Sequence, residues 1–175
     1  MNNEILASAK NVYNELIDFF RNPELRIAMV KAMPDMDCDP DDILTLDALQ
    51  FMVKVSNADG IISQREVNVI NYLTGCYFTV EKLQELAKSG YYSDNCDVPF
   101  SIFFLCQVEN VLLRNTSLSF SILSLTIKFF ELLGNLVADA DGYRSTNEHA
   151  VIKENITKIK NYASENTHSP FYDYD

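Results

Sequence analysis

The feature that most constrains the fold of this chain is a segment of sixteen residues that occurs twice. Residues 55–70 recur as residues 137–152, at a constant offset of 82, and eight of the sixteen aligned residues are identical. The shared pattern is V-x-x-A-D-G-x-x-S-x-x-E-x-x-V-I, and each copy lies between a long apolar stretch and an amphipathic one. Repetition of this kind is typical of like units that stack to bury a common core. The repeat therefore predicts two pseudo-symmetric helix–turn–helix units.

Each shared polar residue has a physical role in such a unit. The glycine allows the positive φ with which a chain reverses after a helix, because it has no Cβ. The serine and the glutamate three residues later form a capping box, in which each side chain accepts a free backbone N–H of the first turn of the next helix. These residues are Gly60, Ser63 and Glu66 in the first copy and Gly142, Ser145 and Glu148 in the second.

The remainder of the chain also predicts helices. Only five Gly and five Pro occur in 175 residues, so turns are few and the elements between them are long. Apolar residues recur at helical spacing, which predicts helices over about 4–20, 23–33, 40–57, 63–74, 80–89, 100–114, 118–138 and 145–163. We therefore expect an all-α, compact bundle of seven to eight helices. Residues 1–163 form a single domain with repeats at about 41–75 and 123–157, followed by an acidic aromatic tail, 164–175.

Charge and composition exclude several classes of function. The formal net charge is −11, from 25 acidic and 14 basic residues. Nucleic acids and anionic membranes are bound by neutralising phosphates, so both are unexpected ligands. No stretch reaches the roughly 20 apolar residues of a membrane span, and no basic segment precedes an apolar one at the N-terminus. The four cysteines lack the spacing of a zinc site. We expect a cytoplasmic protein.

Catalytic motifs are not recognisable in the sequence. His149 and His168 are the two histidines, and neither belongs to a nucleophile–base pattern such as G-x-S-x-G. A phosphate-binding loop of the form G-x-x-x-x-G-K-[ST] is also absent from the sequence. We therefore expect no catalytic residues and no enzymatic activity.

The repeated turn resembles the TerB-like domain of tellurite-resistance proteins, which also occurs at the N-terminus of some J-domain co-chaperones. The residues that carry the resemblance are A-D-G-I-I-S-Q-R-E at 58–66 and A-D-G-Y-R-S-T-N-E at 140–148, where Arg144 replaces the usual aliphatic residue. The resemblance implies a compact helical fold of two pseudo-symmetric halves. It also implies a divalent-metal site at the acidic turns, and a non-catalytic role in bacterial stress response or defence.

The acidic residues of the two turns are candidate metal ligands. If the turns converge, clustered carboxylates could hold a hard cation such as calcium or magnesium, which would relieve their mutual repulsion. The turns also overlap the EF-hand loop pattern, but its first ligand position is Val55 in one copy and Val137 in the other, so an ordinary EF-hand site is not expected. Alternatively, the same carboxylates only cap helices and close turns. The candidates are Asp59, Glu66, Asp139, Asp141 and Glu148.

A metal-free function in protein binding is the other hypothesis. An acidic surface can attract a basic protein partner, as in an adaptor or immunity-type protein. The aspartate-rich segment 35–42 and the tyrosine-rich tail support it, because aromatic residues are favoured at interfaces. In that segment Asp39 is predicted to cap the helix that Pro40 opens.

Overall fold

Eight α-helices make up the part of the chain that the computed structural model describes, which is residues 3–34, 39–89, 98–112 and 121–167. No strand occurs within these ranges. The structure therefore confirms the expected all-α bundle. The helices are α1 (Asn3–Phe20), α2 (Pro23–Ala32), α3 (Pro40–Ser56), α4 (Gln64–Thr74), α5 (Val80–Lys88), α6 (Phe100–Leu112), α7 (Ile122–Ala138) and α8 (Thr146–Asn166).

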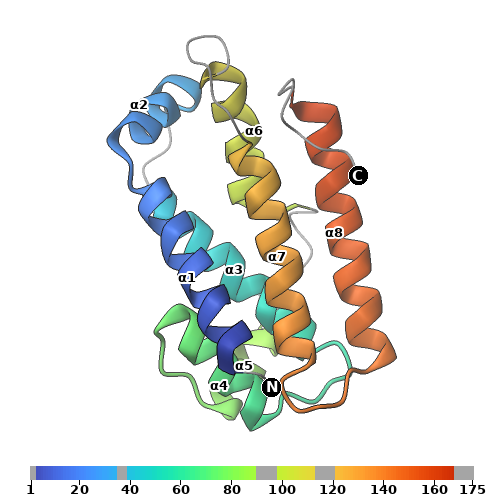
Figure 1. The fold of residues 1–175 in the computed structure, drawn as a ribbon. Helices are drawn as coiled ribbons and strands as arrows, with labels where there is room; N and C mark the ends of the chain where they lie inside the picture. The colour runs from blue at the N-terminus through green and yellow to red at the C-terminus, as the bar shows by residue number, and fades with distance from the viewer. Residues whose placement is uncertain (1–2, 35–38, 90–97, 113–120, 168–175) are drawn as a thin grey trace.

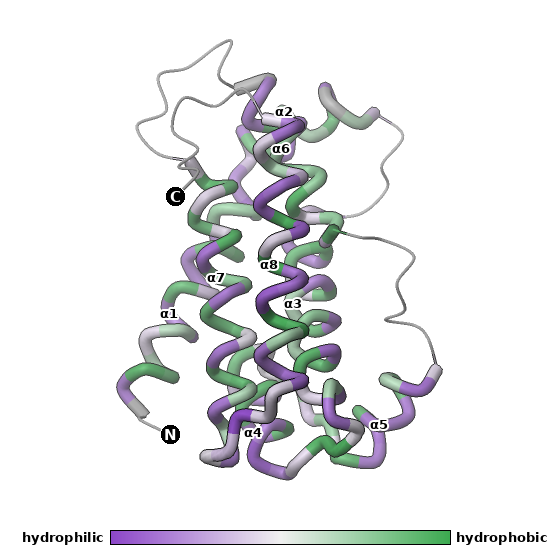
Figure 2. Tube along the Cα trace, turned by 90° about the vertical axis from the view of Figure 1, so that its right-hand side faces the viewer, coloured by the Kyte–Doolittle hydropathy of each residue, from purple (hydrophilic) through white to green (hydrophobic). Residues whose placement is uncertain are grey.

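The two helices that precede the repeated turns, α3 and α7, form the centre of the bundle (Figure 1). They pack against each other, and each also contacts α1, α4, α6 and α8. Both are apolar on most of their surface, which is the pattern of a helix enclosed by others. The hydropathy colouring of α8 instead alternates along its length (Figure 2). Its buried residues include Ile152, Ile156 and Ile159, so it covers the bundle with one apolar face.

A glycine lets the central helices pack closely. Gly134 lies in the C-terminal third of α7, between Phe51 of α3 and Ile152 of α8. A Cβ atom at position 134 would lie 3.0 Å from Cε1 of Phe51 and 3.0 Å from Cγ1 of Ile152, which is closer than carbon atoms normally approach. Phe51 in turn packs edge-on against Phe130, with ring centroids 5.6 Å apart. The missing side chain of Gly134 is therefore part of the packing of the core.

The duplication predicted from the sequence is present in the hydrogen bonds of the two turns. The helices α3 and α7 have the same length and correspond residue for residue at the offset of 82. In both turns the alanine N–H donates to the carbonyl three residues earlier, with an N–O distance of 3.0 Å. Both Gly60 and Gly142 have φ of +84°, in the left-handed region. The two halves therefore share a local structure as well as a sequence pattern.

Two helix ends differ from the sequence-based expectation. The last helix, α8, continues to Asn166, three residues into the predicted tail, while residues 168–175 lie outside the described ranges. Helix α7 begins at Ile122 rather than at Leu118, because the Ser121 side chain accepts the Ser124 N–H at 3.0 Å and caps the helix there. Within the described ranges, no helix has the length and apolar character that a bilayer crossing requires.

Candidate functional site

The aspartates of the Ala-Asp-Gly turns accept hydrogen bonds from their own turns. Oδ1 of Asp59 accepts the N–H of Ile61 at 2.9 Å, and Oδ1 of Asp141 accepts the N–H of Tyr143 at 2.8 Å. This arrangement is the Asx turn, in which a short side chain closes the loop in place of a backbone carbonyl. Both aspartates are exposed. Each therefore has one oxygen bound to its turn and a second oxygen available for another interaction.

The glutamates of the repeat form the capping boxes that the sequence predicts. The backbone N–H of Ser63 donates to Oε2 of Glu66 at 2.6 Å, and that of Ser145 donates to Oε2 of Glu148 at 2.6 Å. The serine hydroxyls complete the boxes by accepting the N–H of the glutamates at 3.3 Å and 3.1 Å. Both glutamates are buried. Their first role is therefore to start α4 and α8.

One of these glutamates keeps an oxygen without a partner. Oε1 of Glu66 is buried and accepts no hydrogen bond from the residues that the structure describes. Burial raises the pKa of Glu66, the N–H and hydroxyl of Ser63 oppose that shift, and the negative charges of Glu148 and Asp141 add to it. Two of the three candidate carboxylates of the second copy, Glu148 and Asp141, therefore act on Glu66 through their charge.

The fifth candidate ligand, Asp139, is held by an arginine. Nε of Arg144 donates to Oδ1 of Asp139 at 2.9 Å, and Nη2 donates to Oδ2 at 2.6 Å. This bidentate pair satisfies both oxygens. Arg144 occupies the position at which the first copy has the buried Ile62. Its departure from the repeat pattern therefore has a structural reason, which the sequence alone did not reveal.

The structure brings the two turns side by side at one end of the bundle, next to α4 (Figure 1). Nη1 of Arg65 donates to the backbone carbonyl of Asp141 at 3.0 Å and so joins α4 to the second turn. The convergence does not extend to a ligand set: no group of three or more His, Cys, Asp or Glu side chains in the described ranges could hold a metal ion. The five candidates therefore share one region without forming a coordination shell.

Two other buried carboxylates each cap the start of a helix other than their own. Oδ2 of Asp47, on α3, accepts the N–H of Ser101 in the first turn of α6 at 2.6 Å, and burial raises the pKa of this aspartate. Oε1 of Glu109, on α6, accepts the N–H of Leu123 in the first turn of α7 at 2.8 Å. The Ser121 hydroxyl also donates to Glu109, at 3.1 Å from Oε1. Neither role was predicted from the sequence, although Glu109 interrupts an apolar stretch.

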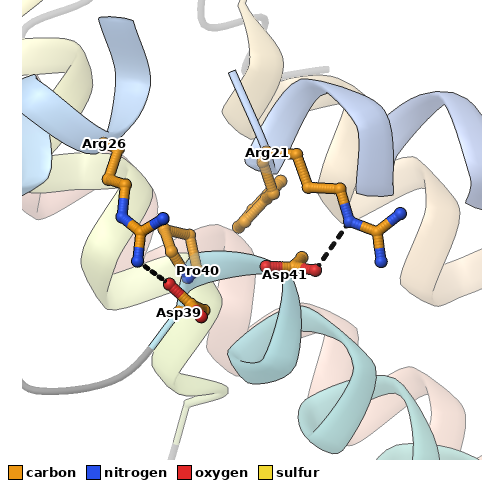
Figure 3. A pocket seen from close by; sticks show the side chains of 6 residues that line it. Arg21, Arg26, Asp39, Pro40 and Asp41 are labelled. Carbon is orange, nitrogen blue, oxygen red and sulfur yellow. Dashed lines mark hydrogen bonds and ion pairs between the residues drawn. The ribbon is translucent and has the colours of Figure 1, made fainter. Parts of the chain in front are cut away.

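A shallow pocket of about 310 Å³ lies at the opposite end, where the corner between α1 and α2 meets the start of α3 (Figure 3). Arg21 pairs with Asp41 at 2.8 Å, and Arg26 pairs with Asp39, on either side of Pro40. Asp39 has the backbone conformation of an N-cap but makes no side-chain capping bond, so the predicted cap is instead an ion pair. Because its cations and anions pair with each other, the pocket has no excess charge to bind a ligand.

The comparisons with known proteins do not place this chain. No model of a known family, no curated protein and no solved structure matches it. The resemblance to the TerB-like domain therefore stays a prediction that rests on the two repeated turns.

Proposed function

We propose that the protein is a non-catalytic interaction module of the TerB-like kind, which binds a basic protein partner through its acidic surface without metal. One observation carries this proposal. The buried charged side chains of the described residues are all carboxylates, namely Asp47, Glu66, Glu109 and Glu148, and each accepts the backbone N–H of a helix start. Buried acids of this kind serve the fold, and the remaining acids of a chain with net charge −11 give the surface its negative charge.

A negative surface favours a basic partner in two ways. It accelerates the encounter by long-range attraction, and it disfavours acidic competitors. The resemblance of the turns to the TerB-like domain is the reason to place this module in bacterial stress response or defence. An adaptor or immunity-type protein that covers a basic partner would use the same surface.

The proposal predicts that the bound partner dissociates from the protein as the salt concentration rises. The tagged protein is purified from its native host at low ionic strength, and bound proteins are identified by mass spectrometry. We expect one or a few basic proteins that elute as the salt concentration rises from about 0.05 M to about 0.5 M, because screening weakens attraction between exposed charges. The control bait is an unrelated helical protein with the same net charge. The proposal fails if every recovered protein also binds the control bait, or if binding does not respond to salt.

A divalent cation at the two turns is the second candidate function. The observation that favours it is the unpartnered Oε1 of Glu66, which lies near the charges of Glu148 and Asp141. A calcium or magnesium ion would supply the positive charge that this oxygen lacks. The cation would then stabilise the contact between the two halves of the molecule.

The cation hypothesis predicts saturable binding and thermal stabilisation. A ligand that binds only the folded state stabilises it by about 2.7 kcal/mol at one hundred times its Kd. We expect the double change Asp59→Asn, Asp141→Asn to abolish both effects while leaving the turns closed, because the amide oxygen still accepts the N–H. The matched control, Glu15→Gln with Asp18→Asn, removes the same charge from the exposed face of α1. A calorimetric titration without saturation at about millimolar calcium or magnesium would rule out the site.

A further inference from the structure

The two turns and α4 form an exposed surface, which we call the twin-turn face and define by Asp59, Ile61, Arg65, Asp141 and Tyr143. Ile61 is 69% exposed and Tyr143 is 72% exposed, and they occupy equivalent positions in the two copies. The bond from Arg65 to the carbonyl of Asp141 holds the turns together. Both copies of the duplication therefore present a large apolar side chain at one end of the molecule.

The exposed side of α4 extends the face by one further aromatic side chain, Tyr72. Arg65, Asn68 and Tyr72 follow one another on α4 at intervals of three and four residues, so they lie on one stripe of the helix, and all three are exposed. Tyrosine, arginine and apolar residues are enriched at the centres of protein interfaces. The equivalent positions of α8 are Asn147, Ala150 and Glu154, so only the first copy adds an aromatic side chain here.

Beside these apolar residues the face carries one positive charge, on Arg65, and two negative charges, on Asp59 and Asp141, so the five residues that define it have a net negative charge. Oδ1 of Asp59 and Oδ1 of Asp141 each accept a backbone N–H of their own turn. Among the described residues, no side chain pairs with either aspartate, so one carboxylate oxygen of each remains available. The face therefore offers two negative groups beside an apolar aliphatic and an aromatic side chain.

We propose that the twin-turn face is the docking site for the basic partner, and that the docked segment carries an apolar side chain flanked by lysines or arginines. The apolar side chain packs between Ile61 and Tyr143, and the flanking cations pair with Asp59 and Asp141. Charge complementarity selects a basic segment over an acidic one, and the apolar contact supplies most of the affinity. This inference rests on the proposed function, because it names the site through which that function acts.

The experiment uses a phage-displayed library of random linear peptides, selected against the full-length protein in the presence of EDTA. We expect the enriched peptides to combine lysine or arginine with large apolar residues. The change Ile61→Ser with Tyr143→Ser should raise their dissociation constants by about tenfold or more, as is usual when central contacts are removed. The change Asp59→Asn with Asp141→Asn should weaken binding about threefold at low salt and have less effect at high salt.

The matched control is Ile27→Ser with Val30→Ser, which removes two exposed apolar side chains from α2, away from the twin-turn face. It should leave the dissociation constants unchanged. If the control variant weakens binding while the twin-turn variants do not, the docking site is elsewhere and only this inference falls. If no basic peptides are enriched, both this inference and the proposed function are contradicted. Thermal melts of all variants show whether each is folded.

A second copy of this chain is a different occupant that the same variants can detect. Light scattering over a range of protein concentrations should show a constant molecular mass for the parent protein. If the mass rises with concentration, and the change Ile61→Ser with Tyr143→Ser prevents the rise, the face joins two copies of this chain and the inference of a basic partner is overturned.

Discussion

Replacing Glu109 with alanine is expected to lower the free energy of unfolding by about 3 kcal/mol, one of the two largest effects that the structure predicts for a single substitution. Glu109 is only 2% exposed, and its carboxylate accepts the N–H of Leu123 at 2.8 Å as well as the hydroxyl of Ser121. Alanine would leave these buried donors unpaired and would also create a cavity. Urea denaturation, followed by circular dichroism, measures the change in unfolding free energy.

The conservative change Glu109→Gln removes the carboxylate charge but keeps the volume of the side chain and one acceptor oxygen. The glutamine side chain has nearly the same size, and its amide oxygen can still accept the Leu123 N–H. We therefore expect a loss of only about 1 kcal/mol. If Glu109→Ala and Glu109→Gln destabilise equally, the capping bond is not the source of the effect. If neither destabilises, α7 does not depend on Glu109 at all.

The change Gly134→Val should also cost about 3 kcal/mol, because it forces a branched side chain between two packed helices. Gly134 has no room for a Cβ, since Phe51 and Ile152 would each be 3.0 Å away. A glycine in the middle of a helix is itself unfavourable by about 1 kcal/mol, so the steric cost must exceed the gain in helix propensity. Thermal and chemical denaturation measure the net result.

Two further variants test this explanation. Leu125→Val places valine on the exposed side of the same helix and should change the stability by less than about 0.5 kcal/mol. Shortening the opposing side chain, with Gly134→Val and Ile152→Ala combined, should recover part of the loss. A double variant that is as unstable as the sum of its two single changes would show that Ile152 is not the obstacle.

Local signals explain why so much of the fold could be predicted from the sequence. The serine and the glutamate of each capping box are three residues apart, and the glycine that permits the turn is three residues before the serine. Such short-range interactions produce a recognisable residue spacing in the sequence, and the recurrence of that spacing indicates the duplication. The starts of α4 and α8 were therefore predicted to within one residue.

The contacts that the sequence did not predict join residues far apart in the chain. Asp47 and Ser101 are 54 residues apart, and Arg65 and Asp141 are 76 apart. A single sequence gives no signal for such pairs, because each side chain alone looks like an ordinary polar residue. Asp139 illustrates the same difficulty, since its ion pair with Arg144 depends on how the turn folds. The grouping of the candidate ligands could be predicted, but not what each carboxylate binds.

The hydrogen bond from Arg65 to the second turn is made by one copy of the repeat and not by the other. Position 147, which is equivalent to Arg65, holds an asparagine, whose shorter side chain cannot make the same reach toward the first turn. Among the described residues, the first half reaches the second turn through this bond and no equivalent bond returns from position 147, so the two halves are not interchangeable. If Arg65 is replaced, Asn147 in the other half cannot make an equivalent bond. The first half therefore tolerates substitution at position 65 less well than the second half tolerates it at position 147.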